Sequence, residues 1–156
     1  MDDISQKILR AKGVYHSLEL PPEVKEASTE LSKAIARKAE ILKALGLSEI
    51  CKRCDIEEGG SCCGRGIENY YDEPLLLLNC ILGVSLHVRR REKDSCLFLG
   101  THGCILRARH TLCVNYLCEK ILNRFSPYSL MELKEAEGRE LEYTFRLCER
   151  LRRYFQ

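Results

Sequence analysis

Apolar residues recur every three or four positions in two stretches near the N-terminus, the spacing typical of amphipathic helices. The first stretch covers residues 2–16 and ends before Pro21 and Pro22, and the second covers residues 23–45 and ends at Gly46. We expect the two helices to pack against each other as a hairpin. Their apolar positions are Ile4, Ile8 and Leu9 in the first helix and Val24, Ala27, Leu31, Ala34, Ile35, Ile41, Leu42 and Leu45 in the second.

A shorter helix is predicted in the middle of the chain. Asp72 is a suitable N-cap, Pro74 fits the first turn, and residues 75–82 are almost entirely apolar up to Gly83. This composition favours a short buried helix. Apolar and polar residues then alternate over residues 84–88, which predicts a short strand or an extended segment.

The helical period returns in the last third of the chain. Residues 110–125 are expected to form one helix, and Ser126 and Pro127 to open another that runs to about Tyr154. Ser129 and Glu132 have the spacing of a capping box at its start. The apolar stripe of this last helix comprises Leu130, Leu133, Ala136, Leu141, Phe145, Cys148 and Leu151.

Two segments, residues 51–66 and 96–109, show no such period and are rich in cysteine, glycine and charged residues. Their shape must be determined by something other than apolar packing, and bound metal is the natural candidate. The predicted fold class is therefore mostly α: a helical domain with two cysteine-rich metal-binding loops.

Length and composition agree with a single folded domain over residues 1–156, since 45% of the residues are hydrophobic and 31% are charged. We divide it into an N-terminal helical hairpin (1–46), a cysteine-cluster metal-binding region (47–125) and a C-terminal helix (126–156). The formal net charge of +2 gives no field that would attract nucleic acid or an anionic membrane. The arginine run 89–91 has no interleaved aromatic residues, so no nucleic-acid partner is expected.

The N-terminal segment alternates charge with hydrophobicity and lacks the features of a secretory signal. The longest apolar run, residues 75–78, is far shorter than the roughly 20 residues of a membrane-spanning helix. We therefore expect a soluble, cytoplasmic protein with no membrane partner. In a reducing compartment, ten cysteines favour metal ligation or redox chemistry over a disulfide framework.

Eight of the ten cysteines fall into two clusters. In the first, two residues separate Cys51 from Cys54, a gap that recurs in structural zinc and iron–sulfur sites, and an adjacent pair follows seven residues later. In the second, the gaps are seven, eight and four residues. We predict that these eight are the metal ligands, for zinc or an iron–sulfur cluster: Cys51, Cys54, Cys62, Cys63, Cys96, Cys104, Cys113 and Cys118.

Several details of this ligand set stay open at this point. Adjacent residues point in different directions, so Cys62 and Cys63 either serve two centres or leave one thiol spare. Cys80 and Cys148 lie on apolar helical stretches and are expected to be ordinary core residues. A thiolate site needs nearby cations, and the neighbouring candidates are Lys52, Arg53, Arg65, Arg107 and Arg109; His102 and His110 flank the second cluster and are interpreted as surface residues.

The cysteine spacing has a parallel among known families. Ser-Cys-Cys-Gly, followed by Cys96-Leu-Phe-Leu-Gly, Gly103-Cys104-Ile-Leu and Cys113-Val-Asn-Tyr-Leu-Cys118, resembles the YkgJ-type cysteine-cluster family, described as a zinc- or iron-chelating domain. The resemblance covers about residues 51–118 and implies a ligand role for all eight clustered cysteines. The first block is stretched relative to the family, and Arg109-His110 stands where Arg-Pro is common.

The leading functional hypothesis is a metal-binding protein that holds zinc or an iron–sulfur centre through cysteine thiolates. The alternatives are an iron–sulfur redox or methyl-transfer enzyme and a thiol redox switch. The sequence contains no zinc-protease helix, phosphate-binding loop or nucleophile elbow, and the resemblance implies no active site. Whether the chain is an enzyme is left open, and no protein partner is predicted.

Overall fold

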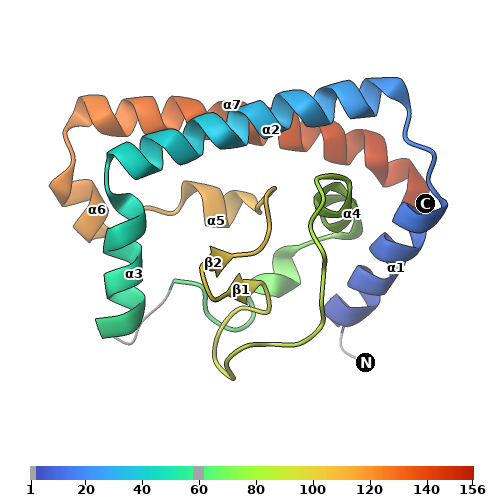
Figure 1. Ribbon diagram of the computed structural model, residues 1–156, viewed down its shortest axis with the longest axis horizontal. Helices are drawn as coiled ribbons and strands as arrows, with labels where there is room; N and C mark the ends of the chain where they lie inside the picture. Colours follow the sequence, from blue (N-terminus) through green and yellow to red (C-terminus); the bar gives the residue numbers. More distant parts are fainter. Residues whose placement is uncertain (1–2, 58–61) are drawn as a thin grey trace.

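The computed structural model describes residues 3–57 and 62–156, and these residues are mostly helical, as predicted (Figure 1). No helix in this part of the chain is long and apolar enough to cross a membrane. The elements, in chain order and with η for a 3-10 turn, are α1 (Asp3–Ser17), α2 (Pro22–Ala44), α3 (Leu47–Glu57), η1 (Ile67–Tyr70), α4 (Glu73–Ile81), β1 (Leu99–Gly100), β2 (Gly103–Cys104), α5 (Thr111–Asn115), α6 (Glu119–Arg124), α7 (Pro127–Leu151) and η2 (Arg152–Phe155).

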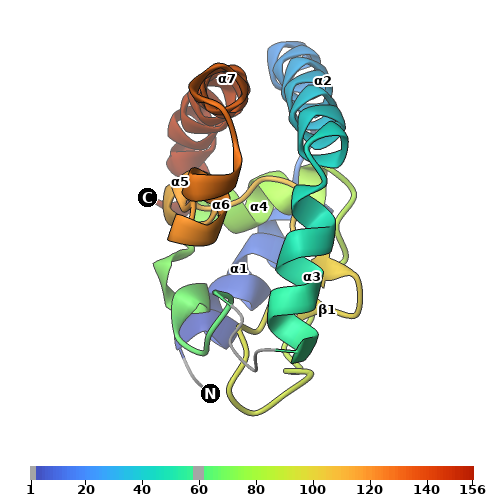
Figure 2. The same cartoon turned by 90° about the vertical axis from the view of Figure 1, so that its left-hand side faces the viewer.

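The two longest helices, α2 and α7, lie side by side in opposite directions and form one layer over the rest of the chain (Figures 1 and 2). Each starts with a proline in its first turn, which suits a position that needs no backbone donor. The Oγ atom of Ser126 accepts the N–H of Ser129 at 3.2 Å and caps α7. The cap therefore lies three residues before the predicted capping box.

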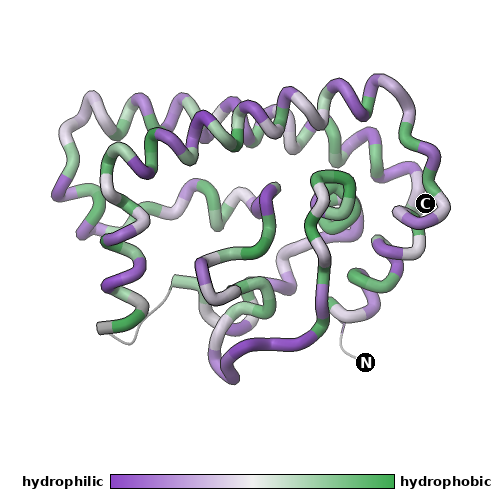
Figure 3. The backbone as a smooth tube through the Cα atoms, viewed as in Figure 1, coloured by the Kyte–Doolittle hydropathy of each residue, from purple (hydrophilic) through white to green (hydrophobic). Residues whose placement is uncertain are grey.

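Helix α4 lies at the centre of the core. Asp72 accepts the N–H of Leu75 at 3.1 Å as its N-cap, and Gly83 follows it with a φ of 86°, a conformation that glycine adopts without strain. Both features confirm the predicted short buried helix. Figure 3 shows the apolar character of this segment against the polar loop around residues 89–94.

The first two helices, expected to form a hairpin with each other, take different partners. Helix α1 packs on α4, and α2 packs along α7. A helix that is apolar on every side must be covered on every side, and α1 and α7 both contribute to covering α4. Helix α2 lies along α7 and buries Val24, Leu31 and Ile41.

The buried face of α7 differs from the predicted stripe at its middle. Phe145 is 65% exposed, whereas Glu137, Glu140 and Thr144 are buried. Glu140 forms an ion pair with Lys38 of α2, and both side chains are almost completely shielded from water. Pairing with a cation is what allows a carboxylate to occupy an interior position that the pattern of apolar residues would not predict.

The cysteine-bearing region differs from the prediction in two places. Residues 84–88 form no strand, and the short antiparallel pair β1–β2 lies instead in the segment expected to be irregular. The helix expected over residues 110–125 is divided into α5 and α6 by extended backbone at Tyr116 and Cys118. The break turns Leu117 toward a small second core that includes Ile121 and Leu133.

Candidate metal centre

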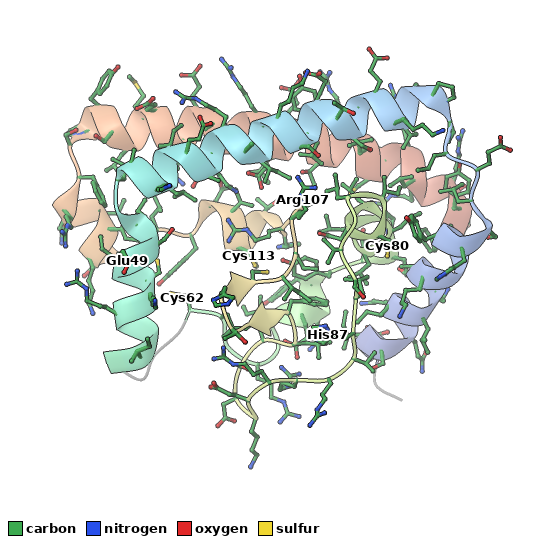
Figure 4. The ribbon with its side chains drawn as sticks, in the orientation of Figure 1. Glu49, Cys62, Cys80, His87, Arg107 and Cys113 are labelled. Carbon is green, nitrogen blue, oxygen red and sulfur yellow. The ribbon has the colours of Figure 1, made fainter. Side chains whose placement is uncertain are left out.

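The first cysteine cluster begins on a helix rather than in a loop. Helix α3 carries Cys51 and Cys54, whose separation of three residues places them on the same face. The predicted irregular segment is therefore wrong for residues 51–57, and residues 58–61 of that prediction lie outside the described residues. Cys51 is exposed and Cys54 is half-buried. Cys62, on the segment that follows α3, is exposed (Figure 4).

Backbone hydrogen bonds join the end of the first cluster to the start of the second. The N–H of Cys96 donates to the carbonyl of Cys63 at 2.7 Å, and the N–H of Arg65 donates to the carbonyl of Asp94 at 2.9 Å. These bonds hold two segments together that are about thirty residues apart in the chain. They place Cys63 directly beside Cys96.

A buried carboxylate reinforces this junction. Glu68 is 2% exposed, accepts the N–H of Gly66 at 3.0 Å and pairs with Arg90, which also donates to the carbonyl of Ser95. Burial opposes ionisation of Glu68, but the hydrogen bonds from Arg90 and from backbone N–H groups outweigh it and lower its pKa. Glu68 is thus a charged clamp between the two cysteine-bearing segments.

The β1–β2 pair returns the chain toward Cys96. Leu99 lies opposite Cys104 in the pair, and Gly103 supplies the positive φ of 102° that its turn requires. The N–H of Ile105 donates to the carbonyl of Phe98 at 2.9 Å just beyond the pair. This hairpin brings Cys104 back into the neighbourhood of Cys96.

Asn79 anchors the next part of the second cluster to the core. This residue of α4 has no exposed surface; its Nδ2 donates to the carbonyl of Ala108 at 2.8 Å and to that of Leu75 at 3.0 Å. Its Oδ1 accepts the N–H groups of Arg107 at 2.9 Å and Ala108 at 3.1 Å. The sequence analysis missed this residue, although a lone amide inside an apolar helix was a usable signal.

Cys113 lies on α5 (Figure 4), and the buried side chain of Tyr71 contacts it. The hydroxyl of Tyr71 accepts the backbone N–H of His110 at 3.1 Å and is 3.6 Å from the Sγ atom of Cys113. The Nδ1 atom of His110 accepts the N–H of Leu112 at 3.2 Å and caps α5, and burial lowers the pKa of His110. A neutral imidazole is the form that can accept this bond. No sequence pattern pointed to Tyr71.

Four thiols form an inner set of electrostatic neighbours. Burial raises the pKa of Cys96 to about 12, and the nearby thiols of Cys104 and Cys63 contribute to this increase in pKa. Burial likewise raises the pKa of Cys104, with Cys63 and Cys113 among its neighbours. We call these residues the inner set: Cys63, Cys96, Cys104 and Cys113.

The remaining four clustered thiols gather around α3. Burial raises the pKa of Cys51, and Cys62, Cys118, Cys54 and Cys63 follow as further causes. The pKa of Cys62 is raised in the same way, with Cys118 as its first charged neighbour. We call these residues the outer set: Cys51, Cys54, Cys62 and Cys118. Relative to the clusters read along the chain, Cys118 joins the residues of the first cluster. Cys63 lies between the two sets, since it also raises the pKa of Cys51 and Cys62.

Groups that stabilise thiolates face the inner set. The backbone N–H of Phe98 lowers the pKa of Cys96, and that of Leu106 lowers the pKa of Cys104, each against the larger effect of burial. Arg109 also lowers the pKa of Cys104 by its charge. Of the other predicted cations, Lys52, Arg53 and Arg65 are exposed, and Arg107 donates to the carbonyl of Leu82 at 3.0 Å.

The thiols are not closed around a common point. In residues 3–57 and 62–156, no three or more His, Cys, Asp or Glu side chains are arranged to hold a metal ion, and all ten cysteines are free. Cys80 and Cys148 are buried in the main core, as expected. His102 is exposed.

Comparison with known proteins gives no relative for this chain. No family model, no curated protein and no solved structure matches it.

Proposed function

We propose that this chain binds a thiophilic metal, as zinc or an iron–sulfur centre, through the thiolates of its clustered cysteines. The observation that carries the proposal is the inner set: four cysteines from three separate segments become neighbours in the fold. Clustered thiols are hard to ionise together, because each thiolate raises the pKa of the next. A bound cation stabilises the thiolates and offsets this effect.

The donor chemistry fits the metals named. Soft thiolates select zinc and iron–sulfur iron over harder ions. The inner set would supply four such donors, with backbone N–H groups and Arg109 offsetting their negative charge. The outer set of Cys51, Cys54, Cys62 and Cys118 would hold a second ion or cluster in the same way.

Metal binding requires two changes in the thiols. Their protons must leave, and burial opposes this at the inner set, so the affinity for metal rises with pH. Their Sγ atoms must also turn toward one point, since the described residues hold no preformed group of three ligands. The backbone junction at Cys63 and Cys96 supports this closure, because it already holds two ligands together.

The test is metal content and colour of the protein purified without oxygen. Zinc yields a colourless protein, and an iron–sulfur centre a brown one with absorption in the visible range. We expect one or two zinc ions, or iron with inorganic sulfide, per chain by elemental analysis. Protein that folds free of metal and takes up neither added zinc nor a reconstituted cluster would overturn the proposal.

Variants test the ligand assignment separately. Replacing Cys104 or Cys113 by Ser exchanges a soft donor for a hydroxyl, and metal per chain should fall. Cys80→Ala and Cys148→Ala are the matched controls, because they remove core thiols at a cost of roughly 1–2 kcal/mol and should leave the metal content unchanged. Loss of metal from Cys148→Ala but not from Cys104→Ser would invert the assignment.

A further inference from the structure

The direction of the hydrogen bond between Tyr71 and Cys113 follows from a third group. The phenol oxygen of Tyr71 receives the backbone N–H of His110 at 3.1 Å, and an amide N–H can only donate. The phenol hydrogen is therefore free to point elsewhere. The Sγ atom of Cys113, 3.6 Å away, is the acceptor that it faces. Cys113 thus receives a hydrogen bond from Tyr71.

The bond has most value when Cys113 is ionised. A neutral thiol sulfur is a weak acceptor, whereas a hydrogen bond to a charged acceptor is roughly twice as strong as one between neutral groups. Tyr71 is 1% exposed, so water does not compete strongly for its hydroxyl. A buried phenol aimed at a cysteine is suited to a sulfur that carries charge.

The ring of Tyr71 is also held in place. It packs edge to face on Phe98, with ring centroids 5.1 Å apart and planes at 68°. The next residue, Asp72, caps α4, so the backbone of Tyr71 is tied to the core. The hydroxyl therefore has a fixed position, and the sulfur that it binds is restricted to one direction.

We propose that Tyr71 is a positioning residue of the metal centre, which orients and stabilises the Cys113 thiolate as a ligand through its hydroxyl. This inference rests on the proposed function and adds an outer residue to it. Outer partners of this kind typically change metal affinity 10–100-fold when removed.

The main test is the affinity of the Tyr71→Phe variant for zinc, measured by competition with a chelator of known affinity. Tyr70→Phe is the matched control: it removes the hydroxyl of the adjacent tyrosine, which is 57% exposed, and keeps the ring that packs on His110. We expect zinc affinity to fall about 10–100-fold in Tyr71→Phe and to be unchanged in Tyr70→Phe. Equal affinities in the two variants would overturn the inference.

Two further measurements distinguish the proposed role of Tyr71 from a purely structural one. Cobalt(II) bound to thiolates gives a sulfur-to-metal charge-transfer band, whose energy reports hydrogen bonding to the ligands. Tyr71→Phe should move this band, whereas a role in packing alone would lower the melting temperature of the metal-free protein and leave the band in place. That second result would overturn the inference.

A replacement that retains the hydroxyl guards against misfolding of Tyr71→Phe. Exchange of Tyr71 for 3-fluorotyrosine keeps the ring and makes the phenol a stronger donor. The cobalt band should therefore move in the direction opposite to the shift in Tyr71→Phe. If Tyr71→Phe does not fold, the band of the fluorinated protein should still differ from that of wild type. An unmoved band contradicts the inference. If wild-type protein binds neither zinc nor cobalt, the proposed function fails; if it binds both and Tyr71 has no effect, this inference alone fails.

Discussion

Asn79 and Ala108 exchange two hydrogen bonds, with the Asn79 side chain donating to the Ala108 carbonyl at 2.8 Å and accepting its N–H at 3.1 Å. The side-chain amide of Asn79 therefore pairs with the backbone of Ala108 through one donated and one accepted hydrogen bond, as two residues on neighbouring β-strands do. Through this contact, the segment between Cys104 and Cys113 is tied to the most buried helix of the protein.

We predict that Asn79→Leu destabilises the protein by at least about 3 kcal/mol, because buried N–H and carbonyl groups of residues 107–108 lose their partner. Denaturant unfolding measures the change. Asn123→Leu, on the exposed surface of α6, is the control and should cost under about 0.5 kcal/mol. Similar costs for the two variants would show that the Asn79 hydrogen bonds contribute nothing.

The Glu68–Arg90 clamp predicts a dependence of stability on acid. Because the pKa of Glu68 is lowered in the folded state, its contribution to stability is complete above the unfolded pKa of about 4.3 and is lost as the pH falls through the folded value. The free energy of unfolding of Glu68→Gln should therefore fall less steeply below that pH than that of the parent. The exposed Glu135→Gln serves as control. Parallel curves for Glu68→Gln and the parent would refute the clamp.

The Lys38–Glu140 pair predicts strong coupling between α2 and α7. Lys38→Met leaves a buried carboxylate without its cation and should cost about 3–5 kcal/mol. Adding Glu140→Met should recover most of this loss, since an apolar pair of similar volume replaces the ion pair. Arg139→Met, which breaks an exposed pair with Glu135, should cost less than about 1 kcal/mol. Additive losses at Lys38 and Glu140 would contradict the coupling.

The two thiol sets differ in exposure, and we predict that they release metal at different rates. Cys51 and Cys62 of the outer set are exposed, whereas Cys96 of the inner set is buried. A chelator added to loaded protein should therefore remove metal in two phases, because access of solvent and competitor governs exchange. The fast phase should disappear in Cys51→Ser and the slow phase in Cys104→Ser. A single phase lost equally in both variants would mean that the eight thiols form one site.

Periodicity predicted the elements whose packing is regular. Helices α1, α2, α4 and α7 were found within a few residues because each buries a stripe or a whole surface of apolar residues. Helix α3 was missed, since Leu47 is its only residue that the described burial places in the core. Phe145 was predicted to be buried in the middle of α7, where Glu140 is buried instead. A pattern of apolar residues cannot show that Lys38 neutralises Glu140.

The candidate ligands could be named from the sequence, but their grouping could not. Which thiols become neighbours depends on the β1–β2 turn, on the backbone bond between Cys63 and Cys96, and on the break between α5 and α6. None of these has a periodic signal. As a result, Cys118 lies near Cys51, and Cys63 lies near Cys104 as well as near Cys51, across the boundary between the clusters in the chain.

The three side chains that anchor the cysteine segments, Glu68, Tyr71 and Asn79, all come from one stretch of twelve residues that contains no cysteine itself. The residues that position the candidate ligands thus lie in a different part of the sequence from the ligands themselves. Transplanting the cysteine motifs alone into another helical scaffold would transfer the thiol donors without the side chains that arrange them. The smallest portable unit includes this stretch, together with the core that supports α4.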